Sequence, residues 1–235
     1  MICKIADLIA EVPEAGGLAP RCKDYLYHGT DCADVIIRTE LYNRDRFPNM
    51  CENDLAYMES ARQFYRALLD YDGFYLHSSA VELNGRAYLF SANCGVGKST
   101  HTRLWKSTFG EAAKVFNDDK PAIRCLDGIW YAYGTPWCGK DGININMKVP
   151  IAGICFLKQA NHNQIRQLSK KEALHKIFPQ TIYKFKDVNK LDLLLGHIDK
   201  LIQQIPVFEL ENRPEPDAAR LSYETMRRKA EEIGL

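Results

Sequence analysis

Apolar residues recur every three or four positions from Glu52 to Tyr71, which is the spacing of an amphipathic helix. The apolar positions are Leu55, Met58, Ala61, Tyr65 and Leu68. Asp72–Gly73 follows directly and is typical of a helix end. Helices are also expected at residues 99–110, 169–178, 187–205 and 215–233. The last third of the chain is therefore expected to be mostly helical.

Shorter apolar runs lie between these helices and predict strands. The runs are at residues 74–83, 86–90, 113–116, 122–126, 129–134, 151–157 and 206–210. Asn84–Gly85 separates the first two runs and Asp127–Gly128 separates another pair, and both dipeptides favour tight hairpin turns. Strands and helices in this order indicate an α/β fold with a mixed sheet and C-terminal helices.

The N-terminal part of the chain has a different pattern. Short apolar runs at residues 3–12, 24–28 and 34–42 are separated by turn residues such as Pro13, Gly16 and Pro20. We therefore expect a small β-rich extension over residues 1–50 and one larger domain over residues 51–235.

Charge and cysteine content argue against several classes of protein. The 235 residues include 31 Lys+Arg and 30 Asp+Glu, and a net charge of +1 argues against a dedicated nucleic-acid-binding protein. The eight cysteines form no C-x-x-C pair and no zinc-like spacing with histidine, so reduced thiols are expected. The first residues lack the features of a signal peptide, and no apolar run is long enough to span a membrane. We expect a cytoplasmic protein without membrane contact.

The stretch SANCGVGKST, Ser91–Thr100, lies where the strand at 86–90 ends and the helix at 99–110 begins. It fits a phosphate-binding loop, with Ala92 in the position of the usual first glycine. Glycines let the backbone curl around an anion, and the start of a helix presents unpaired N–H groups. Lys98 would then reach the outer phosphates, and Ser99 would hold magnesium through its hydroxyl. The alternative is a tight turn with a solvated lysine.

A second candidate is FNDDKP, which places Asp118 and Asp119 after a short apolar strand. In phosphate-binding enzymes, an acidic residue at a strand end helps to hold the metal. Adjacent side chains of an extended segment point in different directions, so one carboxylate could hold magnesium while the other accepts a proton. The alternative is a turn with two solvated carboxylates.

The segments HSSAVELNGRAYLFSANCGVGKSTHTRLW and FNDDKP resemble the catalytic domain of HPr kinase/phosphorylase, a structural relative of phosphoenolpyruvate carboxykinase. The shared features are a histidine on a strand, a hairpin, the glycine-lysine-serine loop and the aspartate pair, within residues 74–157. The resemblance implies a mixed-sheet P-loop domain with C-terminal helices. It also implies transfer of a phosphoryl group from ATP, with Mg²⁺, to a serine-like hydroxyl.

The resemblance further implies roles for individual residues. Lys98 would bind the β- and γ-phosphates, Ser99 and Asp119 would bind Mg²⁺, and Asp118 would accept the hydroxyl proton. His77 would lie close to the phosphates, although a histidine on an alternating strand is also typical of a packed structural residue. The loop that would hold the nucleotide comprises Asn93, Cys94, Gly95, Val96, Gly97, Lys98, Ser99 and Thr100.

The chain also differs from that family. In GTPWCGKDGININ, Lys140 takes the place of an arginine near the transferred phosphate, and lysine cannot form the same bidentate contact. Residues 1–50 are too short for the family's N-terminal regulatory domain, which argues against HPr itself as the acceptor. The chain is more similar to small HPr-kinase-related proteins encoded beside peptide-modification genes. A serine of a peptide or protein is therefore the expected acceptor, and the resemblance also suggests a homo-oligomer.

Three other functions stay open at this point. A nucleotide-binding regulatory or assembly module would need Lys98 and Ser99 but no proton acceptor, so Asp118 and Asp119 distinguish it from a kinase. A kinase acting on the hydroxyl of a small molecule is a second alternative. Carboxykinase chemistry is weaker, because the additional metal-binding residues of those larger enzymes have no counterpart here.

Overall fold

The computed structural model describes residues 1–14, 16–93, 97–182, 184 and 187–235. Across these ranges, nine strands form one mixed sheet. Its strands are β4 (Gly73–Tyr75), β5 (Ser78–Leu83), β6 (Arg86–Ser91), β7 (Lys114–Asp118), β8 (Ala122–Leu126), β9 (Ile129–Tyr133), β10 (Lys148–Gln159), β11 (Gln164–Gln167) and β12 (Val207–Asn212). The mixed α/β class that the sequence predicted is confirmed.

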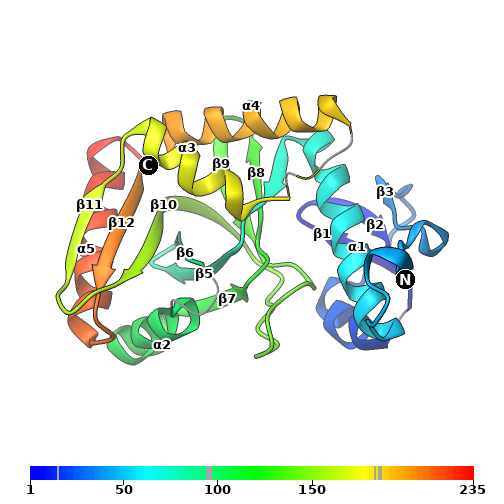
Figure 1. Cartoon of the computed structure of the whole chain (residues 1–235), viewed down its shortest axis with the longest axis horizontal. Helices are drawn as coiled ribbons and strands as arrows, with labels where there is room; N and C mark the ends of the chain where they lie inside the picture. Colours follow the sequence, from blue (N-terminus) through cyan, green and yellow to red (C-terminus); the bar gives the residue numbers. More distant parts are fainter. Residues whose placement is uncertain (15, 94–96, 183, 185–186) are drawn as a thin grey trace.

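The long strand β10 connects the two halves of this sheet. Its first residues pair antiparallel with β9, and its later residues lie between β6 and β12, parallel to both. Beyond β6, the strand order continues through β5 to β7. β6 and β7 are therefore separated by one strand, and their carboxyl ends lie near each other (Figure 1).

Helices cover the two faces of the sheet. These are α2 (Lys98–Phe109) and α5 (Pro216–Glu232) on one face, and α3 (Lys170–Ile177) and α4 (Val188–Gln204) on the other (Figure 1). Along β6, Leu89 packs in the core under α3 and α4, whereas Tyr88 and Phe90 pack in the core with α2 and α5. A strand that is buried on both faces usually has a continuous run of apolar residues, and β6 has such a run. In the described ranges, no helix has both the length and the apolar character needed to cross a bilayer.

The two predicted hairpin turns are confirmed by their backbone angles. Asn84 and Gly85 have φ of 55° and 75°, and Asp127 and Gly128 have φ of 51° and 79°. Two successive residues with positive φ match the right-handed twist of the flanking strands. The turns join β5 to β6 and β8 to β9, as expected.

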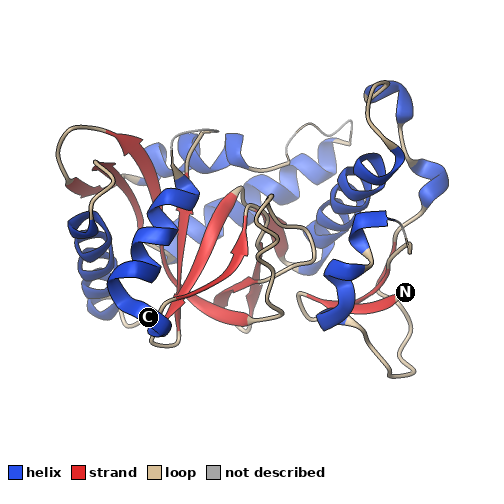
Figure 2. Cartoon of the chain, turned by 90° about the horizontal axis from the view of Figure 1, so that it is seen from below, coloured by secondary structure: helices blue, strands red, loops and turns tan. Residues whose placement is uncertain are grey.

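The N-terminal residues form a three-stranded sheet of β1 (Ile2–Ile5), β2 (Leu8–Glu11) and β3 (Val35–Ile36), visible apart from the main sheet in Figure 2. The strand expected at 24–28 is wrong, because Pro20–Tyr25 is a 3₁₀ helix and only Leu26 forms an isolated bridge. Pro20 stands at the start of this helix, where its fixed φ favours helical geometry. The division at residue 50 stays a prediction.

Helix α1 (Glu52–Leu68) connects the N-terminal sheet to the rest of the chain. Phe64 of α1, Tyr25 of the N-terminal segment and Trp137 share one buried cluster. The N-terminal segment is thus packed against α1 and against the loop that contains Trp137.

Two further differences from the sequence prediction concern strands of the main sheet. The run at 74–83 is two strands, because β4 pairs with β8 whereas β5 pairs with β6 and β7. His77 therefore lies in the connection between them and not on a strand. β11 was not predicted, because its sequence QIRQ is polar and largely exposed at the sheet edge.

Candidate functional site

Helix α2 begins at Lys98, within the predicted phosphate loop, so the last three residues of that loop are helical. Gly97 has φ of 110°, a left-handed value that favours glycine, and its carbonyl accepts the first helical hydrogen bond, from the His101 N–H. The buried side chains of His101 and Trp105 pack on Phe90 of β6 and fix the helix on the sheet. The start of the helix is therefore held beside the end of β6. Cys94, Gly95 and Val96 lie outside the described residues.

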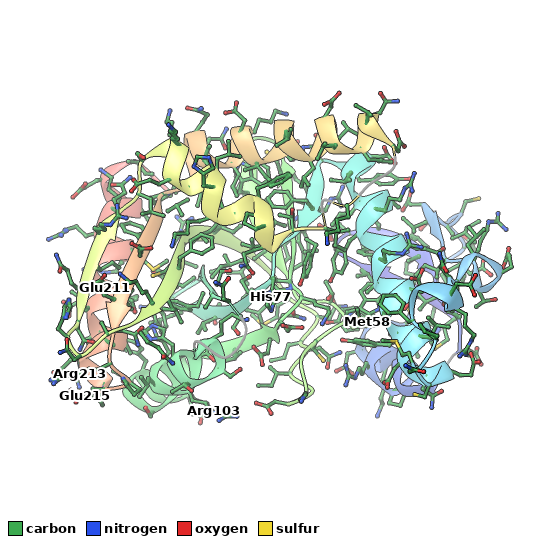
Figure 3. All side chains as sticks on the ribbon, in the orientation of Figure 1. Met58, His77, Arg103, Glu211, Arg213 and Glu215 are labelled. Carbon is green, nitrogen blue, oxygen red and sulfur yellow. The ribbon has the colours of Figure 1, made fainter. Side chains whose placement is uncertain are left out.

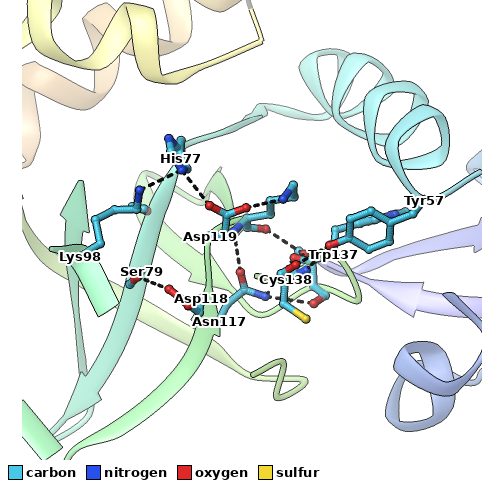
Figure 4. Close-up of polar contacts among 12 residues, drawn as sticks. Tyr57, His77, Ser79, Lys98, Asn117, Asp118, Asp119, Trp137 and Cys138 are labelled. Carbon is cyan, nitrogen blue, oxygen red and sulfur yellow. Dashed lines mark hydrogen bonds and ion pairs between the residues drawn. The ribbon is translucent and has the colours of Figure 1, made fainter. Parts of the chain in front are cut away.

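Lys98 is the first residue of α2, and it reaches across to His77. Its Nζ lies 2.9 Å from Nε2 of His77. The same Nε2 atom lies 2.7 Å from Oδ1 of Asp119 (Figure 4). The other ring nitrogen lies 2.9 Å from Oε1 of Gln180. His77 thus joins the loop lysine to one of the two aspartates.

Asp118 is the last residue of β7 and points toward Ser99. Its Oδ2 lies 3.3 Å from Oγ of Ser99, and its Oδ1 accepts a hydrogen bond from Ser79 of β5. Its side chain is buried, and its backbone carbonyl accepts a hydrogen bond from the Gly139 N–H at 2.6 Å. A side chain at position 139 would crowd Asp118, because a Cβ there would lie 3.2 Å from Oδ2.

Asp119 follows with φ of 90°, so the chain turns sharply and the two carboxylates diverge. Asp119 forms an ion pair with Lys120, and its Oδ1 contacts Nε2 of His77. Burial raises the pKa of Asp119, but the hydrogen bond with His77 and the charge of Lys120 outweigh it and hold this pKa well below its usual range. Asp119 is therefore a stable anion at neutral pH.

The turn that carries both aspartates is shaped by Asn117. Its Oδ1 accepts from the Lys120 N–H at 3.0 Å, and its Nδ2 donates to the carbonyl of Thr135 at 3.0 Å. The neighbouring loop is tied to α1 by Tyr57, whose hydroxyl accepts from the Cys138 N–H at 2.7 Å and donates to the Cys138 carbonyl (Figure 4). These contacts form a rigid frame around the acidic turn.

The remaining predicted residues lie around this centre. Asn93 is exposed, and its Oδ1 accepts a hydrogen bond from Gln180. Thr100 is exposed on α2. Lys140 is exposed and lines the same cleft as Asp119. In Figure 3, His77 lies at the middle of the molecule, between the main sheet and the N-terminal part.

Several residues of the site were not predicted from the sequence: Tyr57, Ser79, Asn117, Lys120 and Gln180. Asn117 and Lys120 flank the aspartate pair and could have been singled out by that proximity. Tyr57 and Gln180 belong to distant helical segments, and no local pattern connects them with the site.

Comparison with known protein families identifies the chain. The family model of the SynChlorMet cassette protein ScmC matches residues 48–212, from just before α1 to the end of β12. The chain belongs to the ScmC family. The HPr(Ser) kinase/phosphatase of Coxiella burnetii is a distant structural match, with 10% identity over 67% of this chain and 90% of the other, and a TM-score of 0.38. No curated protein matches the ScmC-family chain in sequence.

The oxygens at the start of α2 and the end of β7 are of the kind that could hold a magnesium ion. Within the described ranges, no group of three or more His, Cys, Asp and Glu side chains could hold a metal. Magnesium needs no such group, because it commonly takes one or two protein oxygens together with phosphate and water. Ser99 and Asp118 supply such oxygens next to the start of α2. A cavity of about 260 Å³ opens beside both residues.

Proposed function

We propose that this protein is an ATP- and Mg²⁺-dependent kinase that transfers the γ-phosphate to a hydroxyl, namely a serine of a peptide or protein. The proposal rests on one observation, which is that the start of α2 meets the end of β7. Ser99 contacts Asp118, and Lys98 is joined to Asp119 through His77. Phosphoryl transfer needs a cation near the phosphates, oxygens for magnesium and a group that receives the hydroxyl proton. The site offers all three.

The contacts favour different roles for the two aspartates. Asp118 is the carboxylate beside Ser99, so we assign these two residues to magnesium. Asp119 lies on the other side of the turn and lines a different cleft, so we assign it to the acceptor hydroxyl. This assignment is the reverse of the one that the family resemblance implied. When bound, magnesium neutralises the charge of the outer phosphates.

His77 is assigned a positioning role. It contacts Lys98 and Asp119 through one nitrogen and Gln180 through the other. A ring held in this way fixes the distance between the phosphate-binding lysine and the acceptor-side carboxylate. We therefore expect changes at His77 to slow transfer through misplacement of these two groups.

A second function is supported by one observation. The low pKa of Asp119 makes it a weak proton acceptor, because general bases work best with a pKa near the working pH. A nucleotide-binding module without transfer chemistry would tolerate such a carboxylate. The contacts of Asp119 with Lys120 and His77 would then have a purely structural role.

The test combines nucleotide binding with transfer. Lys98→Ala is expected to weaken Mg-ATP binding strongly in calorimetry, because it removes the cation that faces the phosphates. Asp119→Asn should leave that affinity within about tenfold and abolish serine labelling in a cell lysate supplied with labelled ATP. Asp127→Asn, in a hairpin turn away from the site, is the matched control.

Three results would decide between the alternatives. Wild-type affinity in Lys98→Ala would refute the phosphate site. Normal labelling by Asp119→Asn would refute its role toward the hydroxyl. Tight Mg-ATP binding by the wild type without any labelled serine would favour the binding module.

A further inference from the structure

A second cleft lies on the acceptor side of the aspartate pair. It has a volume of about 290 Å³ and is bounded by the N-terminal segment, the start of α1 and the loop at 138–140. Its charged and aromatic lining consists of Arg21, Asp54, Tyr57, Asp119, Lys120 and Lys140. Figure 4 shows Tyr57 reaching from α1 to Cys138 on this side of Asp119.

This cleft is distinct from the cavity beside Ser99. Asp118 and Ser99 line the cavity of about 260 Å³, whereas Asp119 lines the cleft of about 290 Å³. The aspartate pair therefore stands between the two spaces. A phosphoryl group that leaves the nucleotide near Ser99 would meet a hydroxyl that enters from the side of Asp119.

Two cations of the cleft have no carboxylate partner among the residues that the structure describes. Lys120 is paired with Asp119, but neither Arg21 nor Lys140 forms an ion pair with any described residue. The Arg21 guanidinium lies 4.9 Å from the centre of the Tyr57 ring, and one of its nitrogens donates to the Cys138 carbonyl at 3.3 Å. These two contacts orient the guanidinium and leave further N–H donors for a ligand.

The remaining charge in the cleft does not cancel these cations. Asp54 is the one carboxylate of the lining that has no ion pair among the described residues, and its single negative charge is smaller than the combined charge of Arg21 and Lys140. An oriented guanidinium is well suited to bind a planar carboxylate through two parallel hydrogen bonds. A lysine nearby adds a second positive charge without fixed geometry.

We propose that this cleft binds the acceptor, and that the acceptor carries a carboxylate close to the hydroxyl that is phosphorylated. Arg21 and Lys140 hold the carboxylate, and the N-terminal segment thereby selects the acceptor. The inference rests on the proposed kinase function and adds the chemical class of its substrate.

The proposed phosphoryl transfer is balanced in atoms and electrons. The hydroxyl oxygen forms a bond to the γ-phosphorus, and the bond from that phosphorus to the β,γ-bridging oxygen breaks. The bridging oxygen leaves with its electron pair on ADP. The hydroxyl proton passes to a carboxylate oxygen of Asp119 and then to water.

The experiment uses the full chain with Mg-ATP and three mixtures of synthetic peptides, each with one fixed serine and random neighbours. The first mixture has glutamate fixed beside the serine and an amidated C-terminus. The second has glutamine in that position. The third also has glutamine in that position, and its free C-terminal carboxylate lies next to the serine. Labelling is measured for each mixture, and binding is measured by equilibrium dialysis in the presence of Mg-ADP.

The variants are Arg21→Gln and Lys140→Gln, with Lys23→Gln as the matched control. Lys23 is an exposed cation on the same 3₁₀ helix as Arg21 and does not line the cleft. We expect the wild type to bind and label a carboxylate-bearing mixture at least tenfold better than the amide mixture. Arg21→Gln and Lys140→Gln should reduce this preference about tenfold and leave Mg-ATP affinity unchanged. Lys23→Gln should behave as the wild type.

Several outcomes overturn the inference while the kinase function stands. The first is equal labelling of the glutamine mixture and the two carboxylate-bearing mixtures. The second is no labelling of either carboxylate-bearing mixture while serines in the lysate are labelled. The third is a loss of Mg-ATP affinity in Lys140→Gln. The last result would assign Lys140 to the nucleotide. If the wild type binds no Mg-ATP, the proposed function itself fails. Labelling of only the first or only the third mixture supports the inference and shows whether a side-chain or a terminal carboxylate is recognised.

Discussion

The hydroxyl of Tyr57 links α1 to the loop that borders Asp119, and Tyr57→Phe tests what this link contributes. The change removes one oxygen and keeps the ring, so the stacking of Arg21 on the ring is retained. Two hydrogen bonds are lost, one from the Cys138 N–H and one to the Cys138 carbonyl. Tyr57→Phe therefore isolates the polar part of the contact.

The expected loss of stability in Tyr57→Phe follows from the burial of Cys138. Cys138 is 3% exposed, so its N–H loses its partner without gaining full access to water. An unsatisfied buried donor costs about 1–3 kcal/mol. The Cys138 carbonyl keeps its bond from Arg21 and adds little to this cost. We expect a loss of about 2 kcal/mol in the free energy of unfolding, or about 4–8 °C in Tm for a chain of this size.

Urea unfolding followed by far-UV circular dichroism measures this difference. Tyr131→Phe is the matched control, because its hydroxyl has no hydrogen-bond partner in the part of the chain that the structure describes. The control should change stability by less than about 0.5 kcal/mol. Mg-ATP affinity should stay within about twofold in both variants, since neither side chain contacts α2. If the two variants unfold at the same urea concentration, the link to Cys138 does not stabilise the loop.

Three further predictions concern the frame of the fold. Gly85→Ala should destabilise the protein by about 1 kcal/mol in urea unfolding, because φ of 75° is unfavourable for alanine; an unchanged midpoint would contradict the turn geometry. Trp105→Ala should cost about 3–5 kcal/mol, because it removes a fully buried ring and leaves Ser222 without its indole donor; a loss below about 1 kcal/mol would contradict this packing. Burial lowers the pKa of His101 to about 3, so the unfolded state binds the proton first as pH falls below about 6.5. Stability should therefore fall by about 1.4 kcal/mol per pH unit between pH 6 and 4 from this group alone, and His101→Gln should remove that part of the slope.

Most elements of the fold could be predicted from local sequence. The helices at α1 and α2 and the hairpins at Asn84–Gly85 and Asp127–Gly128 follow from apolar periodicity and from turn residues with defined backbone angles. The break at Leu76–His77 could not be predicted, because it arises when the chain leaves one strand partner for another. A continuous apolar run carries no information about which strand lies beside it.

Within the site, the sequence singled out Lys98, Ser99 and the aspartate pair because each lies next to a recognisable local signal. Their roles stay predictions, and the contacts change how they are divided. Ser99 lies beside Asp118 and not beside Asp119, since a positive φ at Asp119 turns that side chain away. A backbone angle of this kind at a non-glycine residue has no clear signature in the sequence.

The amino-acid sequence by itself determined the long helices, the hairpins and the α/β class, because these depend on neighbours a few residues apart. It also singled out the candidate phosphate loop, whose role stays a prediction. The tertiary structure alone decided that Arg21 and Tyr57 share a cleft with Asp119 and Lys140. It also decided that Gln180 orients His77. Pairs of these residues lie more than a hundred positions apart in the chain, and only the packing of the N-terminal segment and the C-terminal helices brings them together.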